Sequence, residues 1–146
     1  MQQNLSKQPI NILSWQDIEY RIQDLKNIFD KYKLNKKITK LYAVPLGGII
    51  PGILLKKKIS LAIEFKVLEE EDSSRETVLI IDDIVDTGKT FTRIFNSFPN
   101  AYFFSLYAKE GFNKIKRLIG NKYETANIFP NRWHVFPWED KDEGKI

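Results

Sequence analysis

The sequence contains no cysteine and only one histidine among its 146 residues. The absence of cysteine excludes disulfides, thiolate zinc sites and a cysteine nucleophile. One histidine is too few for the usual histidine-based metal sites. Any bound metal should therefore take oxygen ligands, as Mg²⁺ does.

Long apolar runs are absent as well. No stretch reaches 18 apolar residues, and residues 1–9 lack the charged and then apolar plan of a signal peptide. We therefore expect a cytoplasmic protein with no transmembrane segment. A length of 146 residues with 42% hydrophobic content predicts a single domain, residues 1–146, around one packed core.

The charge is weighted toward the positive, with a formal net charge of +4, and lysines cluster over residues 31–40 and 56–58. A nucleic-acid module would add an Arg-rich or aromatic-rich surface or a helix-turn-helix pattern, and the sequence shows none of these. We expect a solvated basic face and no nucleic-acid partner. Positive potential also steers small polyanions toward a protein.

Apolar spacing predicts strands that alternate with helices. Ser14 and Asp17 resemble a capping box, and apolar residues from Trp15 to Phe29 recur at helical spacing. The pattern predicts strands over residues 41–45, 61–67, 77–81 and 101–108, helices over 49–57 and 88–98, and a polar loop over 69–76. This alternation is typical of parallel βαβ units in an α/β fold.

The most informative segment is residues 78–90, where four apolar residues lead into three carboxylates and a small turn. Asp82 and Asp83 mark the predicted end of a buried strand, which is where open α/β sheets bind ligands. Residues 87–90 then open a helix whose N–H groups favour a phosphate. The segment is not a Walker loop, because Gly88 has no glycine five positions before it.

The alternative for this segment is an ordinary strand-to-helix junction with capping aspartates. However, the six specified residues of D-D-x-x-D-T-G-x-T match a given window by chance only about once in ten million. The segment resembles the phosphoribosyl pyrophosphate (PRPP) signature of the type I phosphoribosyltransferases. Its ending, D-T-G-K-T, is similar to that of the hypoxanthine-guanine branch.

This resemblance implies a type I phosphoribosyltransferase-like α/β fold, with a mainly parallel sheet, flanking helices and a small C-terminal hood that binds the base. The implied PRPP-binding run is Asp82, Asp83, Ile84, Val85, Asp86, Thr87, Gly88, Lys89 and Thr90. Asp82 and Asp83 would hold the ribose hydroxyls and Mg²⁺, with Asp83 as the metal ligand. Asp86 would exchange a proton with N7 of the base, so the implied catalytic residues are Asp82, Asp83 and Asp86.

Other segments resemble the bacterial xanthine-guanine phosphoribosyltransferases over nearly the whole chain, namely residues 13–17, 44–52, 98–109 and 133–139. By this resemblance, Leu46, Gly47 and Gly48 occupy the place of the pyrophosphate loop. Two glycines at a strand end permit a close approach of backbone N–H groups to an anion. A plain Gly-Gly turn is the alternative for this loop taken alone.

The resemblance also implies three base-binding residues. Lys109 would donate to the 6-oxygen of a purine, Trp133 would stack on the base, and His134 would offer its backbone carbonyl rather than its imidazole. An exposed lysine at a strand end and a core tryptophan are the plainer interpretations of Lys109 and Trp133.

Two features depart from the family pattern. The family carries Arg or Lys immediately before its glycine pair, whereas this chain has Leu46. The loop over residues 69–76 is shorter than the family's hood loop and strongly acidic, and Arg75 is its only arginine. The resemblance therefore assigns Arg75 to pyrophosphate.

The expected activity is transfer of the phosphoribosyl group from PRPP to a 6-oxopurine, with Mg²⁺ as cofactor and release of pyrophosphate. Guanine, xanthine and hypoxanthine remain open as acceptors. The alternatives are a catalytically inactive or regulatory PRPP- or nucleotide-binding module, or a phosphoribosyltransferase for a modified heterocycle. The resemblance also suggests a homodimer or homotetramer.

Overall fold

A computed structural model of the chain describes residues 10–128 and 133–139. Its main feature is a five-stranded sheet in which every pairing is parallel, in the order β3-β2-β4-β5-β6. These strands are β2 (Lys40–Ala43), β3 (Glu64–Val67), β4 (Leu79–Val85), β5 (Tyr102–Ala108) and β6 (Tyr123–Ile128). The parallel sheet confirms the predicted α/β class.

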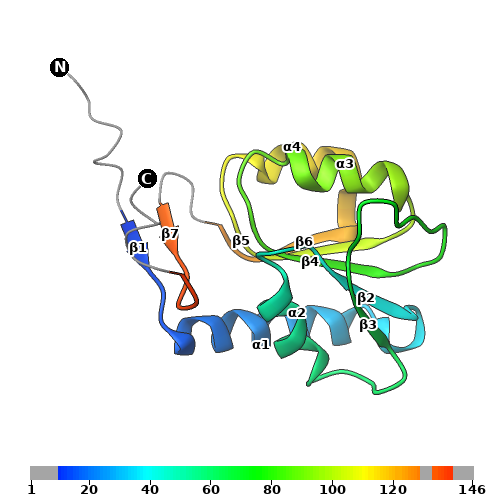
Figure 1. Cartoon of the computed structure of the whole chain (residues 1–146), viewed down its shortest axis with the longest axis horizontal. Coiled ribbons are helices and arrows are strands. Elements are labelled where there is room, and N and C mark those ends of the chain that lie inside the picture. Colours follow the sequence, from blue (N-terminus) through cyan, green and yellow to red (C-terminus); the bar gives the residue numbers. More distant parts are fainter. Residues whose placement is uncertain (1–9, 129–132, 140–146) are drawn as a thin grey trace.

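Helices cover both faces of this sheet (Figure 1). One face carries α1 (Trp15–Lys31) and α2 (Ile49–Lys56), and the other carries α3 (Lys89–Ser97) and α4 (Gly111–Ile119). Short 3-10 turns, η2 (Leu34–Lys36) and η3 (Gly120–Lys122), follow α1 and α4. A hydrophobic cluster fills each side of the sheet. Among the described residues, no helix is both long and apolar enough to cross a membrane.

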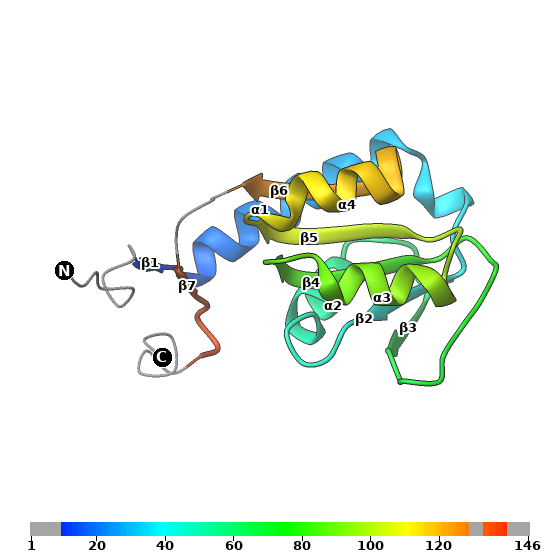
Figure 2. The same cartoon turned by 90° about the horizontal axis from the view of Figure 1, so that it is seen from above.

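The order of the strands creates a switch point between β2 and β4. From β2 the chain passes through α2 to β3 at one edge, whereas from β4 it passes through α3 to β5 on the other side. Figures 1 and 2 show α2 and α3 on opposite faces. The loops after β2 and β4 therefore diverge, and such a divergence leaves a crevice at the carboxyl ends of the strands.

Helix α1 forms as its sequence predicts. The Ser14 hydroxyl accepts the N–H of Asp17 at 3.1 Å, and the Asp17 carboxylate accepts the N–H of Ser14 at 2.8 Å, which completes the capping box. The apolar positions at helical spacing, Ile18, Ile22, Leu25 and Phe29, are all fully buried. Trp15 differs, because it is 52% exposed and its ring lies 5.8 Å from that of Trp138.

The bounds of the strands differ from the predicted ones, most of all in β3 and β4. Strand β3 begins at Glu64 rather than at residue 61, because residues 61–63 form a turn in which the N–H of Ala62 donates to the Ser60 hydroxyl. Strand β4 runs on to Val85, so the two aspartates lie inside the strand and not after its end. Pairing with β5 continues past Asp82, which keeps its backbone in the sheet.

Helix α4 and strand β6 were missing from the sequence-based prediction. The edge strand β6 is only half-buried along most of its length, so it lacks the run of apolar residues that indicates a central strand. Helix α4 has only nine residues and buries just Gly111 and Ile115. Short elements with such mixed patterns are weakly indicated by sequence alone.

A second, two-stranded sheet lies beside the carboxyl ends of β4 and β5 (Figures 1 and 2). It pairs β1 (Ile10–Ile12) in parallel with β7 (Trp133–Val135), and the N–H of Leu13 donates to the carbonyl of Val135 at 2.9 Å. The predicted C-terminal hood is therefore built from both ends of the chain.

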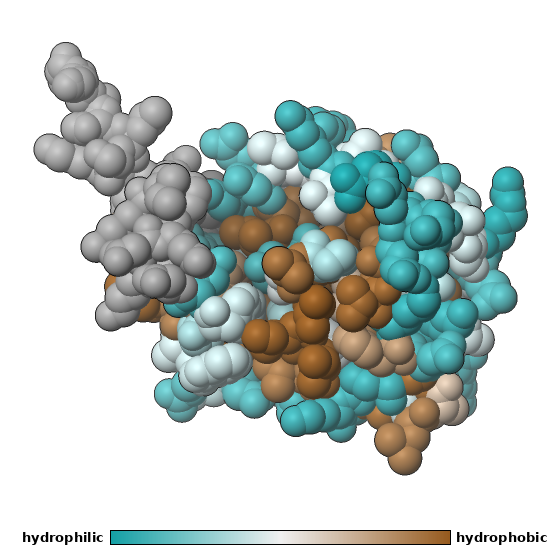
Figure 3. Space-filling view, viewed as in Figure 1, coloured by the Kyte–Doolittle hydropathy of each residue, from teal (hydrophilic) through white to brown (hydrophobic). Residues whose placement is uncertain are grey.

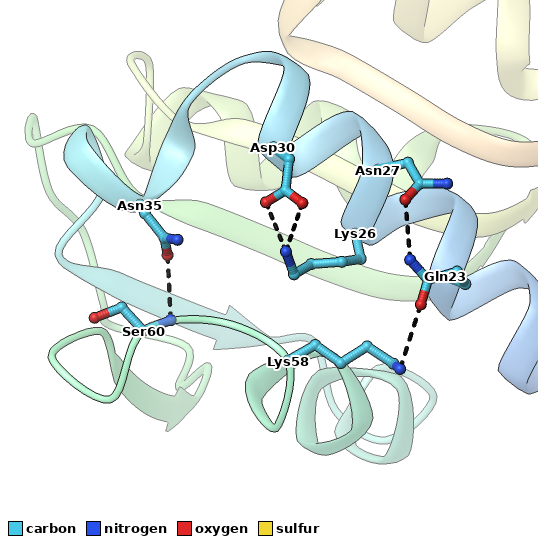
Figure 4. Close-up of polar contacts among 7 residues, drawn as sticks. All are labelled: Gln23, Lys26, Asn27, Asp30, Asn35, Lys58 and Ser60. Atoms are coloured by element: carbon cyan, nitrogen blue, oxygen red, sulfur yellow. Dashed lines mark hydrogen bonds and ion pairs between the residues drawn. The ribbon is translucent and has the colours of Figure 1, made fainter.

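Polar contacts join both α1 and η2 to the segment that follows α2 (Figure 4). Lys58 Nζ reaches Gln23 Oε1 of α1 at 3.4 Å, and the N–H of Ser60 donates to Asn35 Oδ1 at 3.1 Å. These contacts place both lysine clusters at the amino ends of β2 and β3. The basic face is therefore remote from the carboxyl ends of the strands.

Candidate active site

Strand β4 is the central strand of the sheet and brings two carboxylates to its carboxyl end. Asp82 is only 9% exposed, and its Oδ1 accepts the N–H of Asp83 at 2.8 Å. Burial, followed by repulsion from Asp83, raises the pKa of Asp82 well above its usual range. Burial also raises the pKa of Asp83, and the Glu139 carboxylate adds to this rise. The pair therefore favours a cation or hydrogen-bond donors.

The turn that follows β4 encloses a small cavity. Its volume is about 90 Å³, and it is lined by Asp82 and by residues 84–91. Gly88 has a φ of 90°, a left-handed conformation that suits glycine. Gly88 is also the N-cap of α3, where no side chain caps the helix. The first N–H groups of α3 therefore lie beside a cavity at a helix N-terminus, which suits a phosphate.

Helix α4 supports this turn from behind. The N–H of Gly111 donates to the carbonyl of Asp86 at 2.6 Å. A Cβ at Gly111 would lie 2.6 Å from both the nitrogen of Gly88 and the carbonyl carbon of Thr87, which is too close for any side chain. Sequence analysis missed this role, although Gly111 follows Lys109 by only two residues.

The predicted pyrophosphate loop meets the aspartate pair across the switch point. A Cβ at Gly47 would collide with the Asp83 carboxylate, and one at Gly48 would collide with the carbonyl of Ile81. The glycines thus allow the loop to lie directly against β4. Leu46 is 84% exposed, so its side chain points away from the core.

Lys109 also reaches this edge. It comes directly after β5, its N–H donates to the carbonyl of Val85 at 2.8 Å, and its Nζ lies 3.9 Å from Asp86 Oδ1. The Lys109 side chain is 10% exposed, against 61% for that of Asp86. The structure therefore brings a cation next to the third carboxylate, as the sequence predicts.

The hood places His134 above the sheet, with its imidazole packed among aromatic rings. His134 is 7% exposed, and its ring lies 4.8 Å from that of Tyr107 and 6.4 Å from that of Phe136. The backbone of Trp133 pairs with Ile10 in the two-stranded sheet. The Trp133 side chain lies outside the described part of the structure.

The structure does not bring Arg75 to this edge. The Arg75 carbonyl accepts the side-chain amide of Asn100 at 2.7 Å, just before β5 begins. Arg75 thus lies at the amino ends of the strands, opposite the aspartates. Lys66 of β3 binds Asp72 of the acidic loop at 2.7 Å, and the N–H of Ser74 donates to the carbonyl of Ser97 at the end of α3.

A larger cavity of about 530 Å³ lies between this acidic loop and α3. It reaches Val44 and Pro45, just before the glycine loop of residues 46–48, and its lining includes Glu69, Glu70 and Asp72 beside Arg93. Three carboxylates disfavour a phosphate. The smaller cavity at the start of α3 is therefore the better phosphate site, although Arg93 is a cation near the loop that sequence analysis missed.

Comparisons with known proteins agree with this architecture. A purine phosphoribosyltransferase from Pyrococcus horikoshii Ot3 superposes with a TM-score of 0.69 over 89% of this chain and 93% of that one, at 22% identity. The chain has the type I phosphoribosyltransferase fold. No family model matches the sequence.

Two further structures share the phosphoribosyltransferase fold with this chain. The xanthine-guanine-hypoxanthine phosphoribosyltransferase of Helicobacter pylori gives a TM-score of 0.52 at 16% identity, covering 91% of this chain and 95% of that one. A hypothetical protein from Neisseria gonorrhoeae with bound ppGpp gives 0.66 at 19% identity, covering 94% of each chain.

Proposed function

We propose that this protein transfers the phosphoribosyl group of PRPP to a 6-oxopurine and releases pyrophosphate. One observation carries the proposal: the aspartate pair, the uncapped start of α3 and the glycine loop meet at the switch point of the sheet. Several proteins that share the fold are named as purine phosphoribosyltransferases, which supports the same chemistry here.

Each part of PRPP has a matching group. The 5′-phosphate fits the turn over residues 86–90, where helix N–H groups favour an anion. The ribose hydroxyls would donate to Asp82 and Asp83. The pyrophosphate would then lie over Leu46, Gly47 and Gly48, of which Gly47 lies against Asp83. Holding the phosphate at a distance from the reacting carbon positions that carbon for attack.

Mg²⁺ fits this arrangement as an ion shared with the substrate. Asp82 and Asp83 supply oxygen ligands in a buried place where burial and mutual repulsion raise the pKa of Asp82. No group of three or more candidate ligands occurs among the described residues, so those residues alone form no complete cage. One or two carboxylates plus substrate phosphates are typical of Mg²⁺, and the ion would neutralise charge on the leaving pyrophosphate.

The acceptor base would lie between the sheet edge and the hood. Lys109 would donate to the 6-oxygen, Trp133 would stack on the ring, and the carbonyl of His134 would accept from the base edge. The buried imidazole supports a main-chain role for His134. Asp86, next to Lys109, would exchange the proton at N7 while the purine nitrogen bonds to C1 and the bond from C1 to pyrophosphate breaks.

Pyrophosphate release tests this proposal. Purified protein with PRPP and Mg²⁺ should release pyrophosphate with guanine, xanthine or hypoxanthine, and much less with adenine or orotate. Removal of Mg²⁺ by a chelator should stop the reaction, and its return should restore it. Absence of release with all three 6-oxopurines would contradict the proposal.

A regulatory module that binds PRPP or a nucleotide without catalysis is the second candidate. Two observations favour it: Leu46 leaves the glycine loop without its own cation, and one structure that shares the fold has bound ppGpp. This function predicts saturable binding of PRPP or of a guanine nucleotide by calorimetry, with no pyrophosphate released. A modified heterocycle as acceptor would instead show release only with a wider panel of bases.

We also propose that the protein acts in the cytoplasm as a homodimer or homotetramer. Hydrophobic side chains gather over α2 in Figure 3. Leu46 is 84% and Ile53 41% exposed there, beside the half-buried residues Ile49, Ile50 and Leu54. Large exposed apolar patches often mark interfaces. Sedimentation velocity should then show a species larger than the 17.2 kDa chain at micromolar concentration.

A further inference from the structure

Strand β7 carries two of the three proposed base-binding residues, Trp133 and His134, and it is not part of the main sheet. Among the described residues, β7 pairs only with β1, in a separate two-stranded sheet. These residues therefore form no backbone ladder between β7 and β5. Side-chain packing thus helps to set the distance between β7 and the edge of the main sheet.

Tyr107 of β5 is a side chain of the main sheet that contacts β7. Its ring lies 4.8 Å from that of His134 in an edge-on arrangement and 6.0 Å from that of Phe136. Phe136 stacks on Trp138 at 4.9 Å, and Trp138 lies 5.8 Å from Trp15 at the start of α1. A continuous row of rings thus runs from β5 through the hood to α1.

The Tyr107 ring is itself held in place. It is 1% exposed, and burial raises the pKa of Tyr107 to about 12, although the positive charge of Arg21 on α1 opposes this rise. Arg21 in turn binds Asp24 at 3.0 Å. Tyr107 is therefore enclosed between strand β5 and helix α1.

Tyr107 and Lys109 lie two residues apart along the same chain segment. Lys109 would donate to the 6-oxygen of the base. Tyr107 contacts His134, whose carbonyl would accept from the opposite edge of the base. We propose that Tyr107 is a positioning residue that sets base recognition, because it fixes the height of His134 relative to Lys109. This inference rests on the proposed function.

A purely structural role for Tyr107 predicts something different. A core residue that only adds stability would lower the melting temperature and leave the ratio of the two substrate KM values unchanged. A positioning role predicts a selective effect on the base, since the groups proposed to bind PRPP belong to β4 and to the turn before α3 and not to β7. The two roles are thus separated by a KM comparison.

Three variants make the test. In Tyr107→Leu the ring is lost, in Tyr107→Phe only the hydroxyl is lost, and Phe103→Leu is the control. Phe103 is another fully buried ring of β5, but it packs against Phe91 and Phe95 of α3, away from the hood. We expect Tyr107→Leu to raise the KM for guanine or hypoxanthine at least tenfold, with the KM for PRPP within about twofold of wild type.

Tyr107→Phe should keep the base KM within about threefold of wild type, because the ring contact remains. Phe103→Leu should lower the melting temperature by a similar amount to Tyr107→Leu without a selective change in base KM. Equal changes of both KM values in Tyr107→Leu, or the same selective change in Phe103→Leu, would overturn the proposal.

A second readout separates this inference from the proposed function. Hydrogen exchange of the amides over residues 133–136 should be faster in Tyr107→Leu than in Phe103→Leu, whether or not the wild-type protein turns over a purine. Absence of wild-type turnover would refute the proposed function alone. Identical exchange in the two variants would refute the positioning role of Tyr107.

Discussion

Asp82 shows how one buried residue links stability to function. Its pKa is raised in the folded protein by burial and by Asp83. Between the ordinary Asp value and this raised value, the folded state binds more protons than the unfolded state, so stability falls as the pH rises. A negative charge on Asp82, which would suit a cation and a ribose, therefore lowers the stability of the folded protein.

Asp82→Asn should therefore raise the free energy of unfolding at pH 8 in the presence of a chelator. The amide oxygen can still accept the N–H of Asp83, while the buried charge is gone. The advantage over wild type should shrink as the pH falls toward about 4, near the unperturbed Asp value. Urea unfolding at pH 4.5 and pH 8 measures both quantities, and lower stability of the variant at pH 8 would contradict this electrostatic account.

Asp86 is the residue on which the proposed proton transfer depends. Asp86→Asn should lower kcat by roughly 10²- to 10⁴-fold, the usual contribution of a general acid or base. The affinity for PRPP should change by less than about threefold, since the phosphate turn keeps its backbone. Asp30→Asn on α1 is the matched control, and unchanged turnover by Asp86→Asn would exclude the proton-transfer role.

Leu46 offers a test by gain of function. A charge-assisted hydrogen bond contributes about 1.5–3 kcal/mol. At an exposed position we expect a contribution near the lower value, which corresponds to roughly a tenfold gain in affinity. Leu46→Lys should therefore bind PRPP more tightly by calorimetry. Leu61→Lys adds the same charge at a 94% exposed site on the opposite end of the sheet. Equal PRPP affinity of both variants would show that the loop does not meet pyrophosphate.

Residue patterns predicted that the aspartates, the turn over residues 86–90 and Lys109 lie at one edge of the sheet, because they lie near or directly after the carboxyl ends of the parallel strands β4 and β5. The same principle explains why Arg75 does not lie at this edge: it precedes β4 and therefore lies at the amino ends of the strands. Glu139 was missed as a neighbour of Asp83. The position of Glu139 near Asp83 depends on how the hood packs against the sheet. The local spacing of residues carries no information about that packing.

At the scale of elements, helix α4 supports the turn over residues 86–90, the proposed phosphate turn. Gly111→Ala should push its Cβ into the backbone of Thr87 and Gly88 and raise the KM for PRPP at least tenfold. Gly120→Ala is the control: its φ of 76° strains any side chain, but a Cβ there meets nothing within 4 Å. It should lower stability without a change in the KM for PRPP, and the same KM in Gly111→Ala as in wild type would contradict the supporting role.

The long, strongly patterned elements were predictable. The capping box and apolar spacing of α1 and the apolar runs of β4 and β5 carry their own local information. The short hood strands β1 and β7 have three residues each and exist only because they pair with one another. Pairing across more than 100 residues leaves no local pattern to detect.

At the scale of the whole molecule, the strand order matters more than any one motif. The glycine loop and the phosphate turn lie some 40 residues apart in the sequence, and the switch point between β2 and β4 makes them neighbours. The basic clusters lie at the other end of the strands, near η2 and the end of α2. The proposed chemistry therefore depends on the sheet and the hood together.

The most direct measurement is the formation of a nucleoside 5′-monophosphate from PRPP and each 6-oxopurine, followed by liquid chromatography. Nucleotide formation excludes simple hydrolysis of PRPP, which pyrophosphate release alone does not. The account predicts Mg²⁺-dependent formation of the nucleotide of guanine, xanthine or hypoxanthine, largely lost in Asp86→Asn. No nucleotide from any of the three bases, with PRPP binding intact, would contradict the central claim.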